Sequence, residues 1–452
     1  MDLSSSPFPA TRSSLALLFI GLALLVVSSL RVEANGVNRV GIGAKSMGAG
    51  GTAVASPDDS YAGMAVNPAL LGYLEDSDFS LTVVGVVADG AYTNRFGGRG
   101  GLDENTGMFP ELVIRAPLKN GIGLGFSIIP EQTRMADWVY GDVPGGVDGG
   151  TSYGLRHHRS RLEGIRTAVG VGVEISDTLS LGASVGAVYN RNELVAPYIF
   201  QSHPALKGFK TLLAMETEGW GVNGDLGLTW KPDESLILGF AYRTPTVVDS
   251  TGTARGDIGA QLRSLGLRGV ESEFVYDSLV KNEFPDQLTF GGSLRMSDRA
   301  VLSAEAEWIR WSNGFDDLTV DLTKGSNTAI NDLLGSNGIV DTIPLRWRDT
   351  MVYRMGVDYT LTKELMVRAG YQYGESPVPN SSLSPMTGAI SEHTVTCGLT
   401  WAREPYELSL AYQQDLPSTR TINGSRLAGG EYAGGTVDLT THWIGLSVRY
   451  EF

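Results

Sequence analysis

Apolar and polar side chains alternate along most of the chain, and this two-residue period limits the possible folds more than any other feature. In the last stretch, 436–452 (TVDLTTHWIGLSVRYEF), every second residue from Ile444 to Phe452 is apolar, with Ser447, Arg449 and Glu451 between them. Three further stretches repeat the pattern: 301–311, 351–361 and 406–414. Because successive side chains of a strand point to opposite faces, the pattern predicts strands with one apolar and one polar face.

The connections between these stretches alternate in length. Short turns occur at 118–121, 176–178, 232–235, 297–299, 362–364 and 403–406, whereas the other connections are long. Short turns at one end and long loops at the other are typical of an outer-membrane barrel, and a closed barrel leaves no unpaired strand edge in lipid. Aromatic residues near strand ends are expected to form interfacial belts: Trp230, Tyr242, Trp308, Trp311, Trp401, Tyr412 and Trp443.

Fourteen strands can be assigned, and the even count places the first beside the last. Their expected ranges are 77–93, 109–118, 121–131, 164–175, 179–192, 219–231, 235–248, 285–296, 300–313, 349–361, 364–375, 391–402, 406–415 and 436–452. The predicted fold is all-β, a 14-stranded antiparallel transmembrane β-barrel over residues 77–452.

The first 34 residues have the pattern of a secretory signal peptide. Arg12 precedes the apolar run from Leu15 to Leu30, and Val32-Glu33-Ala34 offers the small or medium residues that a signal peptidase reads. The alternative is a membrane anchor, but the run is shorter than the roughly 20 residues of a spanning helix. We expect cleavage of residues 1–34 and a bacterial outer-membrane location.

The composition gives no support to nucleic-acid binding or to catalysis. The net charge is −15, whereas a phosphate-binding protein needs a basic face. Cys397 is the only cysteine in the sequence, so no cysteine metal site or disulfide framework is available. The segment GIGAKSMGAGG lacks the strand and βαβ context of a dinucleotide site, and Asp58-Asp59 fits a helix start better than a metal site. We therefore expect no enzyme activity, no cofactor and no metal.

Residues 35–76 precede the first strand and contain a short punctuated segment. Ser56 can cap a helix in which Pro57 and Asp59 occupy the first turn, and Asn67-Pro68 ends it because the residue before proline disfavours the helical region. The segment could lie in the periplasm or inside the barrel. The glycine- and alanine-rich stretch 41–55 favours a plug, or hatch, because such residues allow close backbone contact.

The hatch segment resembles that of the FadL/TodX family of outer-membrane transporters of long-chain fatty acids and other hydrophobic compounds. The resemblance rests on a glycine-rich stretch followed by an Asp-Asp segment and the motif Asn67-Pro68-Ala69. Further segments are similar in the same order: 242–252, 284–295, 306–314 and 353–379. The resemblance implies a monomeric, plugged barrel for passive uptake of hydrophobic molecules through lipid and lipopolysaccharide. Phe452 ends a strand resembling the insertion signal read by the barrel-assembly machinery.

Two long loops carry apolar residues at helical spacing, and these are the candidate capture residues. They are Leu206, Phe209 and Leu213 in one loop and Ile258, Leu262 and Leu265 in the other. The resemblance implies a groove between these loops that takes the ligand first. The alternative is that the two helices only pack together as a lid.

The resemblance also implies binding in the lumen against the hatch and lateral release where the third strand bends. Gly123, Gly125 and Pro130 in that strand are candidates for the opening, although Pro130 could simply end the strand. Strand parity turns four arginines inward as possible partners of a fatty-acid carboxylate: Arg115, Arg354, Arg368 and Arg449. Glu305, Glu307 and Asp358 could instead neutralise them. A general porin or a structural barrel is the alternative to the transporter.

Overall fold

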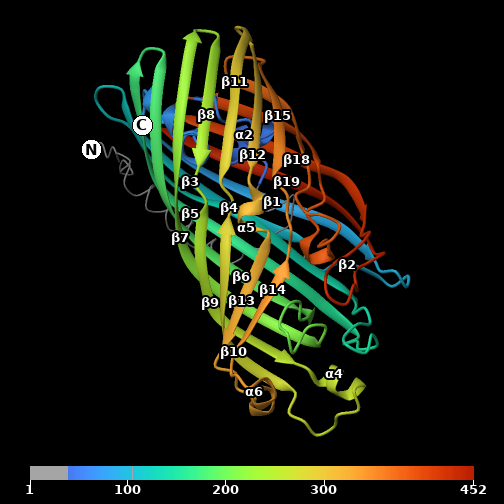
Figure 1. Cartoon of the computed structure of the whole chain (residues 1–452). Helices are drawn as coiled ribbons and strands as arrows, with labels where there is room; N and C mark the ends of the chain where they lie inside the picture. The colour runs from blue at the N-terminus through green and yellow to red at the C-terminus, as the bar shows by residue number, and fades with distance from the viewer. Residues whose placement is uncertain (1–38, 104) are drawn as a thin grey trace, which may run out of the picture.

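The computed structural model describes residues 39–103 and 105–452. The predicted signal peptide, 1–34, and the first residues of the predicted hatch lie outside these ranges. The wall has fourteen antiparallel positions, here called staves, each made of one strand or of two strands in line. It closes into a barrel, as predicted, because β1 (Asp78–Thr93) pairs with β19 (Thr436–Glu451) along its whole length. In Figure 1 the C-terminus lies near the end with the short turns, and α4 and α6 lie at the other end.

Ten staves consist of one continuous strand each. In addition to β1 and β19 they are β3 (Thr106–Pro117), β4 (Ile122–Gly141), β5 (Leu155–Ser176), β6 (Leu179–Ile199), β7 (Lys210–Asp233), β16 (Leu365–Gly374), β17 (His393–Arg403) and β18 (Tyr406–Thr421). Strands β4 to β7 extend further toward the long loops than the sequence predicts. A short strand, β2 (Arg99–Leu102), lies in the first long loop.

Four neighbouring staves are each made of two segments. They are β8 (Leu236–Arg243) with β9 (Thr246–Asp257), β11 (Gln287–Ser297) with β10 (Glu273–Phe284), β12 (Ala300–Ile309) with β13 (Asp317–Thr323), and β15 (Thr350–Thr360) with β14 (Ile339–Pro344). The interruptions share one level, because Arg243 pairs with Gln287, Gln287 with Ile309, and Ile309 with Thr350. Pro245 and Pro285 lie at two of them and lack the N–H that a ladder needs.

Apolar side chains of the strands point outward and polar ones inward, as the predicted alternation requires. Two of the aromatic residues expected in the interfacial belts, however, do not lie on the outer surface. Trp230, Trp401 and Tyr412 are exposed on the outer surface. Trp311 is buried in α5 (Trp311–Gly314), and Trp443 is buried against Phe109 with ring centroids 6.2 Å apart. The prediction placed both at the membrane interface. It was wrong because Trp443 has lumenal parity and because the strand ends at Ile309, before Trp311.

The hatch fills the lumen with three short helices. They are α2 (Gly43–Gly48), α3 (Ala62–Ala65) and the 3-10 helix η1 (Pro68–Tyr73), and α2 lies within the ring of strands in Figure 1. The hatch backbone approaches the wall closely: a Cβ added to Gly48 would lie 2.9 Å from the Gly398 Cα. No side chain fits there, which is the physical reason for glycine at both positions.

The predicted helix start at Ser56 is wrong. Residues 56–60 form turns, in which the Asp59 side chain accepts a hydrogen bond from the Tyr61 backbone N–H at 2.9 Å. A side-chain bond of this kind competes with helix formation. The predicted break at Asn67-Pro68 is present, since α3 ends before it and η1 begins at Pro68. Within the described ranges, no helix has the length and apolar character needed to cross a membrane.

Candidate transport route

The turn at Asn67 fastens the hatch to the wall. Asn67 is fully buried, and its Nδ2 donates to the carbonyl oxygen of Val54 at 2.7 Å and to Thr229 Oγ1 at 3.0 Å. Its Oδ1 accepts from the Ala69 N–H at 3.1 Å, which caps η1 after Pro68. One amide therefore joins the hatch to itself and to β7.

Five of the six candidate capture residues lie in one apolar cluster at the long-loop end, here called the outer cluster. Leu206, Leu213, Ile258 and Leu262 are each 8% exposed, and Phe209 packs against them. Leu265 points away and is 44% exposed. The second loop forms the expected helix, α4 (Gly259–Ser264), but the first forms a turn, and Leu213 lies in β7. In this structure the two loops pack together as a lid.

A hub of buried polar groups ties four long loops together. The Lys210 Nζ donates to Asp142 Oδ1 at 2.7 Å and lies 3.3 Å from Glu431 Oε2. The Lys210 backbone N–H donates to Gln261 Oε1 at 3.1 Å. Burial raises the pKa of Glu431 to about 7, although the charge of Lys210 opposes the shift. This hub was not predicted, because its members are far apart along the chain.

Beneath the outer loops, a second apolar cluster occupies the upper lumen, and we call it the aromatic cluster. Its ring-bearing members include Tyr92, Trp138, Tyr140, Phe284, Trp311, Trp347 and Tyr432. Trp311 and Trp347 pack edge to face with centroids 5.4 Å apart, and Tyr92 and Tyr140 lie 4.8 Å apart. Aromatic surfaces of this kind suit flat or flexible apolar molecules.

A cavity of about 70 Å³ lies between the hatch and the wall, and we call it the hatch cavity. In contrast to the aromatic cluster, its lining mixes small apolar hatch residues with many polar and charged side chains from the wall. The charged side chains around it are Arg39, Glu131, Arg243, Glu305, Glu307 and Arg354. Arg354 donates to Glu305 at 2.7 Å and to Glu307 at 2.5 Å, so these charges are paired.

The ladder between β3 and β4 is incomplete. Pairing runs from Pro117 with Gly123 to Leu112 with Ile128 and then stops. Among the described residues, no ladder joins 106–111 of β3 to 129–137 of β4, whereas each of these segments remains paired on its other side. Strand β2 closes the outer end by pairing with Val139 and Trp138. A lateral gap in the wall results, here called the β3–β4 gap.

Of the three candidate opening residues, one lies at this gap. Pro130 stands at a bulge in the β4–β5 ladder, just beyond the last β3–β4 pair. Gly123 and Gly125 lie in the paired part, and their lack of a side chain accommodates the hatch instead. A Cβ on Gly123 would lie 1.9 Å from the Leu71 carbonyl oxygen, and one on Gly125 would lie 2.3 Å from Met64 Sδ.

Arg39 occupies the gap from the hatch side, which the sequence did not indicate. Its Nη1 donates to the Pro130 carbonyl oxygen at 3.1 Å and lies 2.5 Å from Glu111 Oε1. Its guanidinium also lies 5.1 Å from the ring centroid of Phe109. The hatch thus supplies a partner to a carbonyl that the interrupted β3–β4 ladder does not pair.

The four candidate carboxylate partners face the lumen or its rim, and each is already bonded to an acid. Arg115 and Arg449 both bind Asp78, and Arg368 Nε donates to Asp358 Oδ2 at 3.2 Å. Arg354 binds the two glutamates of the hatch cavity. A free cationic site for a fatty-acid carboxylate is therefore not formed by these four residues.

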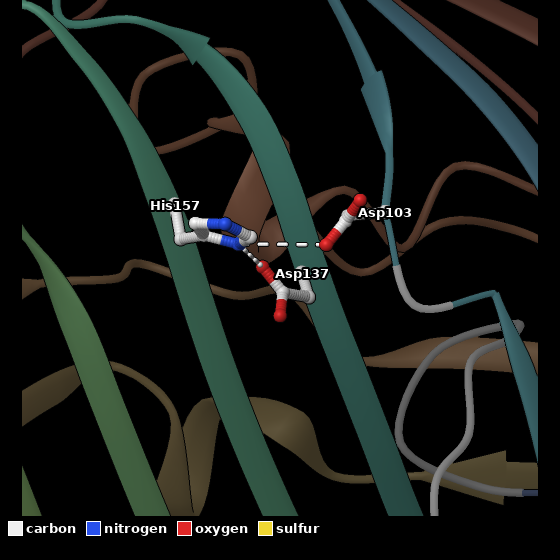
Figure 2. A group of neighbouring side chains, drawn as sticks. All are labelled: Asp103, Asp137 and His157. Atoms are coloured by element: carbon white, nitrogen blue, oxygen red, sulfur yellow. Dashed lines mark hydrogen bonds and ion pairs between the residues drawn. The ribbon is translucent and has the colours of Figure 1, made fainter.

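The outer end of the gap carries a trio with metal-ligand chemistry that the sequence did not predict. Figure 2 shows Asp103, Asp137 and His157 pointing toward one another, with His157 Nδ1 3.1 Å from Asp137 Oδ1 and 3.7 Å from Asp103 Oδ2. Arg159 also binds Asp137, at 2.7 Å. Because a guanidinium already neutralises the one buried carboxylate, the trio is explained as an ion-pair cluster where β2 meets β4.

Three solved structures share the fold of this chain at low sequence identity. The toluene transporter TbuX of Ralstonia pickettii is 22% identical with a TM-score of 0.70, over 91% of this chain and 99% of that chain. The toluene transporter TodX of Pseudomonas putida is 22% identical with a TM-score of 0.69, over 91% and 98%. A Pseudomonas aeruginosa FadL homologue is 18% identical with a TM-score of 0.68, over 94% and 100%.

A curated protein of Neisseria meningitidis serogroup B, named as a candidate outer-membrane protein, is 25% identical over 166 residues. That match covers 36% of this chain and 34% of the relative. The family model described as outer membrane protein transport protein (OMPP1/FadL/TodX) matches residues 25–452. The chain therefore belongs to the FadL/TodX family of outer-membrane transport proteins.

Proposed function

We propose that this outer-membrane barrel is a channel for the passive uptake of hydrophobic compounds, which leave it sideways through the β3–β4 gap. The gap is the observation that carries the proposal. A plugged lumen offers no straight water-filled path, whereas an opening in the wall leads an apolar molecule directly into apolar surroundings. Two structural neighbours are named as toluene transporters, which supports the same class of cargo.

The remaining steps of the proposal follow the apolar surfaces. The outer cluster receives the compound from the lipopolysaccharide layer when its two loops part, and the aromatic cluster holds it in the upper lumen. The contacts of Arg39 with Pro130 and Glu111 then break, and the hatch moves aside to give the compound access to the gap. In this proposal the protein works as a monomer, after cleavage of residues 1–34 and insertion by the barrel-assembly machinery, and it needs no cofactor or metal.

The test is a chemical cross-link between β3 and β4, the two strands that border the gap. Phe109 of β3 and Met135 of β4 belong to one apolar cluster across the gap. Both are replaced by cysteine in a Cys397→Ala background, and a short bis-maleimide joins them in membranes. We expect the joined protein to bind a hydrophobic probe with unchanged affinity but to lose most of its uptake into cells.

Each single-cysteine variant treated with the same reagent is the matched control, and its uptake should stay near the untreated value. Heat-modifiable migration on gels reports that the barrel is folded. Full uptake by the joined, folded protein would mean that cargo leaves by another route. Loss of both binding and uptake would place the effect at the binding step.

A further inference from the structure

The aromatic cluster and the hatch cavity adjoin along four separate staves. Gln132 of β4 lines the cavity, and Ala136 further along the same strand belongs to the cluster. The same order recurs from Gln287 to Phe284, from Glu307 to Ile309, and from Arg354 to Val352. The lumen is thus layered, with an apolar zone toward the outside and a polar chamber beside the hatch. A molecule lying along the axis would meet both layers.

The charges around the chamber are already matched. Three guanidinium groups and three carboxylates line it, and each guanidinium is within ion-pair distance of an acid. Arg243 donates to Glu131 Oε2 at 2.8 Å and to Asp225 Oδ1 at 2.6 Å. An added carboxylate would bring an unpaired negative charge into a buried site, which is strongly unfavourable.

Hydrogen-bond acceptors, in contrast, remain unmatched. In the part of the chain that the structure describes, Gln132 Oε1 is buried without a hydrogen-bond partner, and so is the hydroxyl of Ser46. Glu131 Oε1 also makes no hydrogen bond and has only a 3.9 Å ion pair with Arg166 Nη1. All three residues line the chamber and are less than a tenth exposed. Buried acceptors of this kind call for a donor, supplied either by water or by a ligand.

We infer that the preferred cargo is a hydrophobic alcohol or phenol, whose apolar body lies against the aromatic cluster and whose hydroxyl donates a hydrogen bond into the hatch cavity. This inference rests on the proposed uptake function. A hydroxyl satisfies an acceptor without adding charge. A plain hydrocarbon leaves the acceptors to water, and a carboxylate adds the charge that the chamber cannot pair.

The experiment compares three probes with the same carbon chain: 1-dodecanol, dodecanoate and dodecane. Binding to the full-length, detergent-solubilised protein is measured by equilibrium partition, with protein-free micelles as the baseline. We expect dodecanol to bind at least about fivefold more tightly than either other probe, the effect of one net hydrogen bond to a buried acceptor. In Gln132→Met this advantage over dodecane should disappear while dodecane binding stays unchanged.

Gln413→Met is the matched control, because Gln413 is also a buried glutamine with an unpartnered Oε1, yet it does not line the cavity. It should keep the preference for dodecanol. Ser46→Ala offers a second variant of the chamber if Gln132→Met fails to show heat-modifiable folding. Equal binding of all three probes, or an unchanged preference in both chamber variants, overturns the inference but leaves the uptake function standing. Binding of none of the probes above the baseline rejects both.

Discussion

At the scale of single residues, one amide side chain decides how firmly the hatch is held. Asn67 provides both donors and an acceptor to buried backbone and side-chain groups. In Asn67→Ala these partners lose their bonds, and each buried group left unpaired costs about 1–3 kcal/mol. We expect the hatch to loosen while the barrel stays closed, which would appear as brief channel openings in planar bilayers.

The variant Asn67→Asp separates the hydrogen bonds that Asn67 donates from the one that it accepts. An aspartate can still accept from the Ala69 N–H but cannot donate to Val54 or Thr229. Its bilayer recordings should therefore resemble those of the alanine variant. Quiet recordings from Asn67→Asp beside an active Asn67→Ala would show that the cap of η1, rather than the bond to β7, holds the hatch.

Cys397 tests the register of β17. Its side chain is exposed on the outer face, as the strand parity predicts, together with Val395 and Leu399. A membrane-soluble maleimide should label it in intact membranes, and a charged maleimide should not, because the site faces lipid. Thr396→Cys in a Cys397→Ala background is the comparison, since Thr396 is buried against the hatch. Rapid labelling of Cys397 by the charged reagent would contradict the register.

The raised pKa of Glu431 predicts that the stability of the closed outer loops depends on pH. Its pKa is raised to about 7 by burial in the closed arrangement, against an ordinary value of 4.5. The closed loops therefore bind the proton more tightly than the open loops, and their stability falls as the pH rises from 4.5 through about 7. Hydrogen exchange in residues 422–435, corrected for intrinsic rates, should be faster at about pH 8 than at about pH 5.5, by at least about tenfold.

Glu431→Gln should remove most of this difference, because glutamine does not titrate in that range. The ionisable groups that face Glu431 are Lys210, Asp142, Tyr432 and Tyr92, and burial raises the pKa of both tyrosines further above this range. A variant that keeps the full pH dependence would assign the effect to Asp142, whose pKa is also raised by burial.

Residue-level inference from the sequence succeeded where strand parity alone decides. It placed Cys397 outside and Arg115, Arg354 and Arg368 inside. Strand parity gives the direction of a side chain but not the residue that it contacts. The ion pairs of these arginines and the contacts of Arg39 could therefore not be predicted without knowing how distant strands are aligned. The Lys210 hub needed the placement of four loops.

At the scale of elements, the hatch is an insert in a wall that closes without it. The β1–β19 ladder that closes the wall involves no hatch residue. Deletion of residues 35–74 should therefore leave a barrel that inserts and shows heat-modifiable migration. Its lumen would be open, so sugars should swell proteoliposomes several-fold faster, and uptake of hydrophobic probes should fall. Normal uptake with no new conductance would mean that the segment closes nothing.

Elements were predictable where the two-residue period is long and unbroken, as in β17, β18 and β19. The divided staves were not, because the predicted range 235–248 ran across Pro245 and the predicted range 285–296 began at Pro285, so that β10, β13 and β14 fell in connections. Only the paired strands reveal these outer segments and the interruptions before them. The helix expected at Ser56 failed for a related reason. Its capping residues bond within a buried turn whose shape is imposed by the surrounding wall.

At the scale of the whole molecule, the two-residue period and the alternating loop lengths predicted a closed barrel, and the glycine- and alanine-rich first segment together with the family resemblance predicted a plug. The gap was not predictable. It depends on β3 and β4 parting after six pairs while β2 returns to meet β4 further out, and this is a property of three strands together. Pro130 hinted at its position without indicating its extent.

The shared level of the four divided staves has a mechanical consequence. A continuous ladder transmits bending along its length, whereas a row of interruptions across adjacent strands acts as a crease. Beyond the crease, β9, β10, β13 and β14 pair in that order, and β9 also pairs with the continuous strand β7. The outer rim can therefore tilt as a panel attached along β7, while the portion embedded in the bilayer keeps its circumference.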